Sequence, residues 1–249
     1  MSQSLGIVQL AYGDLRPTAK AGRKLAGKSL LEWVVRRVTD CQRLGQVAVV
    51  LSDNAEERPL AELVPPDVSV YFAHHKDPLG RLVEALGCFG ASAVVRVCAD
   101  NPFVDPVWID RLVTTAEAHP GCDYISYCSR DGKPVILSPL GMYAEWCSAS
   151  ALRAAHRQAT APLDRRHATR YLYSHPELFT VRLIPLPPEL DREDLRLTID
   201  AEEDWEHALA IHDVLGSDEW DWRRIAGMFD RQPALRNRVP VLNGGRAEE

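Results

Sequence analysis

Short, nearly continuous apolar runs recur along the first half of the chain, with amphipathic stretches between them. A continuous apolar run of a few residues is typical of a strand that is covered on both faces. Strands that alternate with helices predict a parallel sheet with right-handed crossovers and helices on both sides. The predicted strands in this half are residues 5–11, 47–51, 68–72 and 93–98.

The stretches between these runs carry helix-start signals. Ser29 and Glu32 stand three residues apart before an amphipathic stretch, which predicts a capping box and a helix beginning near Leu30. Asn54 can cap a short helix that ends at residue 63, before two prolines. Further helices are predicted at 77–89 and 105–119, where an Asp-Pro pair supplies the cap and the first helical residue.

The second half of the chain is less regular. A strand at 124–127, a turn at 131–132 and strand-like segments at 135–137 and 142–146 predict a small antiparallel excursion. Later elements are predicted as helices at 148–158, 164–173, 201–215 and 222–229, and as strands at 179–184 and 195–199. The expected fold is therefore α/β and Rossmann-like, with a mostly parallel, doubly covered sheet. We expect one domain over residues 1–231 and an extended tail at 232–249.

Composition narrows the class of protein. Hydrophobic residues make up 46% of the chain and charged residues 26%, which excludes disordered, coiled-coil and collagen-like classes. No apolar run is long enough for a membrane helix and no leader precedes the first strand, so a cytoplasmic location without membrane contact is expected. Six cysteines are scattered without a paired spacing, which indicates neither a zinc site nor a disulfide framework.

Positive charge is concentrated in one segment, although the net charge of the chain is -6. Residues 13–29 connect the first strand to the first long helix, and Asp14 is their only acidic residue. Glycines and a helix N-terminus in such a crossing favour the binding of phosphate groups, whereas duplex nucleic acid would require a broader basic face. The segment is predicted to bind a polyphosphate, the alternative being a solvated basic loop. Its basic residues are Arg16, Lys20, Arg23, Lys24 and Lys28.

Residues 22–29, GRKLAGKS, match the phosphate-loop pattern G-x-x-x-x-G-K-[ST]. A true phosphate loop begins where a buried strand ends, whereas here the predicted strand ends near Ala11. This context favours a coincidental match, and a phosphate-loop kinase remains the less favoured alternative.

Two aspartates follow predicted strands. Asp100 comes after the strand at 93–98 and Asp200 after the strand at 195–199. Ligands of open α/β sheets bind at the carboxyl ends of the strands, and Mg²⁺ in phosphate sites takes one or two carboxylates. The pair is therefore predicted to hold Mg²⁺, with helix capping as the alternative for each. Glu145 is a further carboxylate of interest.

Several segments taken together resemble the spore coat polysaccharide cytidylyltransferases, relatives of the CMP-Kdo and CMP-acylneuraminate synthetases. The resemblance spans about residues 6–229. The matching segments are residues 9–20 with Q-A-R-M-G-S-T-R-L-P-G-K, 27–33 with G-K-P-L-L-E-W, 77–81 with D-V-L-x-R, 95–102 with V-R-I-T-G-D-C-P, 123–126 with D-Y-V-S, 141–147 with G-L-D-x-E-V-F, 165–169 with R-E-H-V-T, and 196–204 with R-x-T-V-D-x-x-E-D.

The resemblance implies a nucleotide-diphospho-sugar transferase fold and the transfer of CMP from CTP to a sugar or sugar acid, with release of pyrophosphate. It implies Mg²⁺ on Asp100 and Asp200, and a homodimer is left open. It also implies catalytic roles for Lys20, Arg16 and Asp100, and substrate-binding roles for Glu145 and His167. The implied nucleotide-binding residues are Gln9, Gly13, Arg16, Lys20, Arg23 and Arg81.

The chain departs from the family pattern at two positions in the basic segment. Ala11 stands where the family has a phosphate-binding arginine, and Asp14 replaces a small hydroxyl residue. The alanine removes a positive charge that would attract a triphosphate, and the aspartate adds a negative charge that would repel it. The alternative hypothesis is therefore a nucleotide-binding homologue that has lost catalysis and serves as a subunit or scaffold in polysaccharide synthesis.

Overall fold

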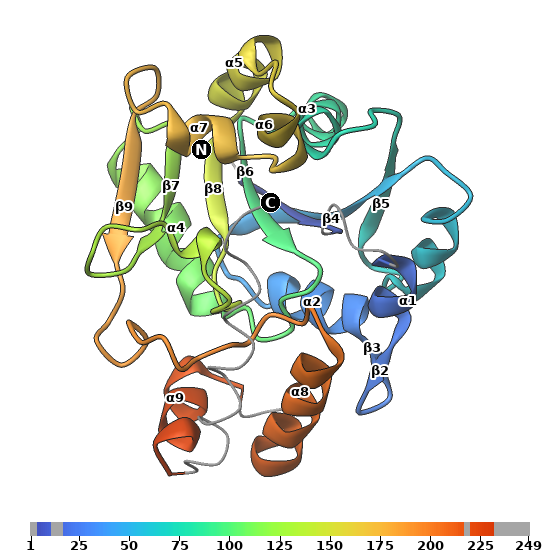
Figure 1. Cartoon of the computed structure of the whole chain (residues 1–249). Coiled ribbons are helices and arrows are strands. Elements are labelled where there is room, and N and C mark those ends of the chain that lie inside the picture. The colour runs from blue at the N-terminus through green and yellow to red at the C-terminus, as the bar shows by residue number, and fades with distance from the viewer. Residues whose placement is uncertain (1–3, 11–16, 217–219, 232–249) are drawn as a thin grey trace.

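A computed structural model describes residues 4–10, 17–216 and 220–231 of the chain (Figure 1). Ala11, at the predicted end of the first strand, and the predicted tail at 232–249 lie outside these residues. The main sheet has the strand order β5-β4-β1-β6-β8-β7-β9. Its strands are β1 (Ser4–Gln9), β4 (Leu44–Ser52), β5 (Ser69–Ala73), β6 (Ala93–Cys98), β7 (Tyr124–Cys128), β8 (Glu145–Ser148) and β9 (Val181–Pro185).

The sheet is mostly parallel. β1 lies between β4 and β6 and pairs in parallel with both, β4 pairs in parallel with β5, and β7 pairs in parallel with β9. β8 runs antiparallel to its two neighbours, β6 and β7. The predicted α/β class and the antiparallel excursion are confirmed. Because β8 is reversed, its first residue, Glu145, lies at the edge where β6 ends.

Helices cover both faces of the sheet, as the alternating pattern predicts. In Figure 1, α3, α5, α6 and α7 gather on one side, whereas α2, α8 and α9 lie on the other. Among the described residues, no helix combines the length and the apolar character needed to cross a membrane. The helices are α1 (Pro17–Gly22), α2 (Leu30–Thr39), α3 (Pro78–Phe89), α4 (Pro106–Ala118), α5 (Ala149–Gln158), α6 (Pro162–Arg166), α7 (Arg170–Ser174), α8 (Glu202–Leu215) and α9 (Trp222–Arg231), with 3₁₀ turns η1 (Arg58–Leu63) and η2 (Val135–Leu137).

The helix caps explain why these helices begin where they do. The Ser29 hydroxyl accepts a hydrogen bond from the Glu32 N–H at 3.1 Å. The Asp77 carboxylate accepts from the Gly80 N–H at 2.9 Å, and Asp105 accepts from the Val107 N–H at 2.9 Å. The three predicted starts are therefore confirmed, each by a side-chain oxygen that satisfies an N–H of the first turn.

Four predicted elements differ from the structure. Residues 195–199 form no strand, because the N–H groups of residues 197–199 bond to the carbonyls of Pro139 and Asp100, which belong to no strand. Residues 135–137 form the 3₁₀ turn η2, and residues 58–63 form η1 instead of an α-helix. The helix predicted at 164–173 is broken between α6 and α7, where the chain leaves helical geometry at His167.

The basic segment contains more structure than the predicted open loop. It folds into α1 and then a hairpin of β2 (Lys24–Leu25) and β3 (Lys28–Ser29). Ala26 and Gly27 have φ angles of 49° and 84°, as a two-residue turn between antiparallel strands requires. The Lys28 ammonium lies 4.5 Å from the centre of the Trp33 ring. This hairpin is not a phosphate loop, so the structure contradicts the kinase alternative.

Gly141 allows two chain segments to approach closely. Its φ is +64°, and an added Cβ would lie 2.6 Å from the Thr198 nitrogen and 2.7 Å from the Leu197 carbonyl carbon. The Leu197 N–H, meanwhile, donates to the Pro139 carbonyl at 2.9 Å. A side chain at position 141 would therefore push the segment before Asp200 away from the sheet.

Replacing Gly141 by alanine is expected to destabilise the protein by roughly 3 kcal/mol, because it adds a backbone clash to left-handed strain. Gly132→Ala is the matched control, since Gly132 has φ +80° but no atom within 4 Å of the added Cβ. That variant should lose only roughly 1 kcal/mol. Urea unfolding measures both, and equal losses would show that the close approach is unimportant.

Candidate active site at the carboxyl edge of the sheet

The carboxyl ends of β1 and β6 meet at one edge of the sheet. The Ala99 N–H donates to the Gln9 carbonyl at 2.9 Å, and Asp100 follows directly. Lys20 of α1 reaches the same place, with its ammonium nitrogen 3.8 Å from Asp100 Oδ2. The structure therefore brings Lys20 and Asp100 together as predicted. Gly13 and Arg16, like Asp14, lie outside the described residues.

Asp200 lies beside Asp100 although no strand precedes it. The Ile199 N–H donates to the Asp100 carbonyl at 3.0 Å, which joins the two segments directly. Asp200 Oδ2 accepts from the Thr198 hydroxyl at 2.9 Å and from Arg196 Nη2 at 3.3 Å. The N-cap of α8 is Ala201 and that of α4 is Asp105, so neither Asp100 nor Asp200 is an N-cap residue.

The donor set fits Mg²⁺. Two carboxylates on adjoining segments supply hard oxygen ligands, and Mg²⁺ bound to phosphates takes one or two protein carboxylates besides water. Lys20 and Arg196 stand against these carboxylates. Positive side chains at this distance offset the repulsion between two neighbouring acidic groups. A shared cation on Asp100 and Asp200 stays a prediction that this arrangement supports.

Asp204 anchors the segment that carries Asp200. Its carboxylate accepts from Arg196 Nε at 2.5 Å and Nη2 at 2.9 Å, and from the N–H groups of Asp200 and Ala201, both at 2.9 Å. Although burial favours the neutral acid, these hydrogen bonds lower the pKa of Asp204 below its ordinary value. Asp204 is therefore charged near neutral pH.

Glu145 belongs to a buried polar network on the face covered by α3, α5, α6 and α7. Its Oε2 accepts from Arg96 Nη1 at 2.8 Å, and its Oε1 accepts from the hydroxyls of Tyr124 and Thr169, each at 2.6 Å. Burial, and then the charge of Glu145, raises the pKa of Tyr124 well above its ordinary value. Tyr124 thus remains a hydrogen-bond donor, and Glu145 holds Arg96.

Three residues predicted to bind nucleotide make contacts within the protein. Gln9 Nε2 donates to the Pro78 carbonyl at 3.0 Å. Arg81 lies 3.4 Å from Glu57 Oε1 and donates to the carbonyls of residues 75 and 76. Arg23 forms a two-pronged pair with Glu202 of α8 and lies 4.1 Å from the Trp205 ring centre. Arg23, the residue after α1, therefore connects this part of the chain to α8. The nucleotide-binding roles of all three residues stay predictions.

His167 lies at the end of α6 and its side chain is exposed. The pKa of its imidazole is lowered below the ordinary value, first because surrounding protein removes part of its hydration and then because of the charges of Arg166 and Arg96. A neutral imidazole at pH 7 can accept a hydrogen bond from a sugar hydroxyl. Its predicted contact with substrate is untested.

Sequence reasoning did not identify Arg96, Arg196 or Asp204 as parts of this edge. Arg96 had a visible signal, since it is the single charged residue of the otherwise apolar strand at 93–98. Arg196 and Asp204 lie at the two ends of the segment 196–204, whose middle holds Asp200. Their eight-residue separation gives no indication of the contact, which depends on how α8 begins.

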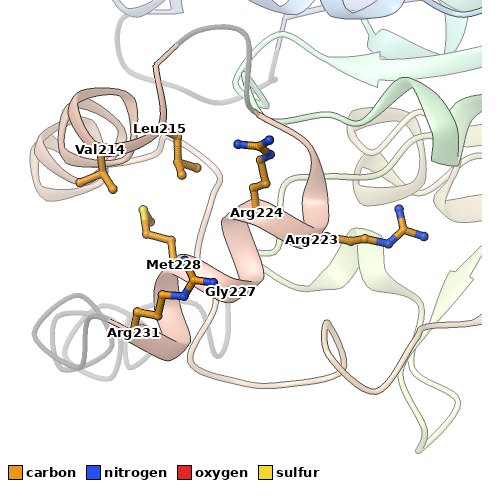
Figure 2. A pocket seen from close by; sticks show the side chains of 7 residues that line it. All are labelled: Val214, Leu215, Arg223, Arg224, Gly227, Met228 and Arg231. Carbon is orange, nitrogen blue, oxygen red and sulfur yellow. The ribbon is translucent and has the colours of Figure 1, made fainter.

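A separate pocket lies between α8 and α9, away from the sheet edge (Figure 2). Val214, Leu215 and Met228 form its apolar side. Figure 2 shows the side chains of Arg223 and Arg231 pointing in different directions, so they do not converge on one ligand position. The pocket contains none of the predicted site residues.

The chain matches the family model described as cytidylyltransferase over residues 6–220. The chain belongs to this family. It is 30% identical to the uncharacterized protein MJ1063 of Methanocaldococcus jannaschii over 234 residues, 94% of this chain and 93% of that protein. It is 29% identical to the spore coat polysaccharide biosynthesis protein SpsF of Bacillus subtilis over 222 residues, 87% of this chain and 89% of SpsF.

Several solved structures share the fold. A cytidylyltransferase from Leptospira borgpetersenii superimposes with a TM-score of 0.82 at 21% identity, covering 94% of this chain and 96% of that one. A CMP:2-keto-3-deoxy-manno-octonic acid synthetase, solved with CTP, gives a TM-score of 0.64 at 13% identity, covering 86% and 99%. Rv0371c of Mycobacterium tuberculosis, solved with manganese, gives 0.57 at 17% identity, covering 84% and 98%. These likenesses confirm the fold predicted for this chain.

Glu145→Gln is expected to cost about 3 kcal/mol of stability, because Arg96, whose side chain is only 12% exposed, loses the carboxylate with which it forms a salt bridge. Glu117→Gln is the control, since Glu117 pairs with Arg43 at 2.9 Å on the exposed surface. Loss of an exposed pair should cost less than about 1 kcal/mol. Denaturant unfolding of both variants checks the difference, and a Glu145→Gln protein as stable as the control would contradict the importance of the network.

Proposed function

We propose that this chain is a Mg²⁺-dependent cytidylyltransferase that transfers CMP from CTP to a sugar or sugar acid. The observation that carries the proposal is the meeting of Lys20, Asp100 and Asp200 at the carboxyl edge of the sheet. Family membership supports the nucleotidyl transfer, and the likeness to SpsF supports an acceptor used in polysaccharide synthesis.

In the proposed reaction, an acceptor hydroxyl attacks the α-phosphate of CTP. The new oxygen–phosphorus bond forms as the bond from the α-phosphorus to the oxygen shared with the β-phosphate breaks. Pyrophosphate leaves, and the proton of the acceptor hydroxyl passes to solvent water. Lys20 places a positive charge against the triphosphate, where it stabilises the negative charge that grows on the phosphate oxygens. Its pairing with Asp100 holds the ammonium in place before the nucleotide arrives.

Asp100 and Asp200 would hold Mg²⁺, which when bound supplies further neutralisation of phosphate charge. The acceptor is proposed to lie toward Arg96 and Glu145, on the sheet face covered by α3 and α6. Arg96, fixed by Glu145 and by Gln9 Oε1 at 3.3 Å, presents a rigid donor surface there. His167, neutral at pH 7, can orient an acceptor hydroxyl.

The second candidate is a nucleotide-binding homologue without catalysis, which Ala11 and Asp14 favour. The two candidates separate in one experiment. The protein is incubated with CTP, Mg²⁺ and a panel of sugars and sugar acids, while pyrophosphate release and CTP binding are followed by a coupled assay and calorimetry. Release with one acceptor supports the enzyme, CTP binding without release across the panel supports the second candidate, and absence of both contradicts the two.

Lys20→Ala is expected to lower kcat/KM for CTP on the order of a hundredfold or more, because it removes a positive charge from the triphosphate. Lys28→Ala is the matched control. Lys28 lies in the adjacent hairpin and contacts the Trp33 ring, so its loss should leave kcat/KM nearly unchanged. The reverse ranking would contradict the role proposed for Lys20.

A further inference from the structure

The segment that carries Asp200 belongs to no helix or strand. Its backbone is held by the bond from Ile199 to Asp100 and by the bonds of residues 197 and 198 to the Pro139 carbonyl. These contacts place the backbone but leave the carboxylate of Asp200 to be fixed by side chains. Thr198 and Arg196 both donate hydrogen bonds to this carboxylate.

Arg196 lies between two carboxylates and contacts them unequally. It forms a two-pronged pair with Asp204, at 2.5 and 2.9 Å, and a single longer contact of 3.3 Å with Asp200. Arg196 and Asp204 are buried, with 6% and 3% exposure. A buried guanidinium pairs most strongly with the carboxylate that it grips with both prongs. Asp204 therefore takes most of the pairing capacity of Arg196.

We propose that Asp204 is a positioning residue for the metal site, which acts by holding Arg196 so that Asp200 stays available to a divalent cation. The inference rests on the metal pair of the proposed function. Without the charge of Asp204, the guanidinium would turn its second prong to Asp200, the nearest remaining carboxylate. A cation that binds to Asp100 and Asp200 would then have to displace Arg196 from Asp200.

Capping of α8 does not account for this arrangement. The cap needs only the two bonds that Asp204 accepts from the N–H groups of Asp200 and Ala201. The salt bridge between Arg196 and Asp204 is not needed to satisfy those N–H groups. Arg196 does, however, connect the carboxylate at the start of α8 to the carboxylate predicted to bind metal, and this connection gives Asp204 an influence beyond the helix.

The test measures the Kd of Mn²⁺, used alone as the probe, by electron paramagnetic resonance on the full-length protein. Asp204→Asn should weaken Mn²⁺ binding about tenfold or more, the usual effect of losing an outer partner of a metal ligand. The control is Asp194→Asn, because Asp194 forms a similar two-pronged pair with Arg192 at 2.6 Å for each prong. Arg192 of that pair also donates to Asp230 of α9 at 2.8 Å, so the pair supports α9 and the Kd of this variant should not change.

Removal of the arginine distinguishes positioning from a loss of helix stability. Arg196→Met takes away the competing cation, so its Mn²⁺ affinity should equal or exceed that of the unmodified protein. The double variant Arg196→Met with Asp204→Asn should regain most of the affinity lost in Asp204→Asn. A cap-only role predicts no such recovery.

Each outcome decides between the hypotheses. If the unmodified protein binds no Mn²⁺, the metal pair of the proposed function fails, and this inference fails with it. If it binds Mn²⁺ but Asp204→Asn binds equally well, only the positioning role fails. Weakened binding in Arg196→Met would also overturn it, and this variant decides the question even if Asp204→Asn does not fold.

Discussion

One backbone hydrogen bond, from the Ile199 N–H to the Asp100 carbonyl, joins the early and late parts of the candidate site. Asp100 follows a central strand of the sheet, whereas residue 199 lies in an irregular segment that reaches the edge only because Gly141 leaves room for it. If this approach were lost, Asp200 would move away from Asp100 and Lys20. The site therefore depends on a contact between two loops. One of them, which carries Asp100, is fixed by the strand β6 of the main sheet.

The charged groups around this contact are paired with one another. Lys20 faces Asp100, Arg196 faces Asp204 and Asp200, Arg96 faces Glu145, and Arg23 faces Glu202. Ligand binding at such an edge exchanges one set of ionic partners for another, which requires less reorganisation than gathering free charges. Arg196 is one example, because it pairs more closely with Asp204 than with Asp200. This inequality favours the exchange of Arg196 for a cation on Asp200.

The sequence predicted the fold well because its signals were local. Apolar runs marked the strands, and Ser29, Asp77 and Asp105 marked helix starts that need only one neighbouring N–H group. The position of Asp100 at the edge of the sheet followed from a local signal too, because β6 ends just before it. The hairpin at 24–29 was missed because Ala26 supplies a left-handed residue without a glycine signal. Asp200 lies at the site because of loop contacts and not because a strand precedes it. Such contacts, like the salt bridge between Arg196 and Asp204, leave no periodic pattern in the sequence.

The reversal of β8 has a consequence for how new specificities can arise. Asp100 and Glu145 are both fixed to β6, one beyond its end and the other across its antiparallel ladder. The chain between them leaves the edge and returns to it, so residues 101–144 form an excursion with both ends anchored. The same excursion contains Pro139 and Gly141, which hold the segment before Asp200. A change that reshapes the surroundings of Arg96 and Glu145 must therefore keep these contacts, so recognition of a new acceptor is coupled to the position of Asp200.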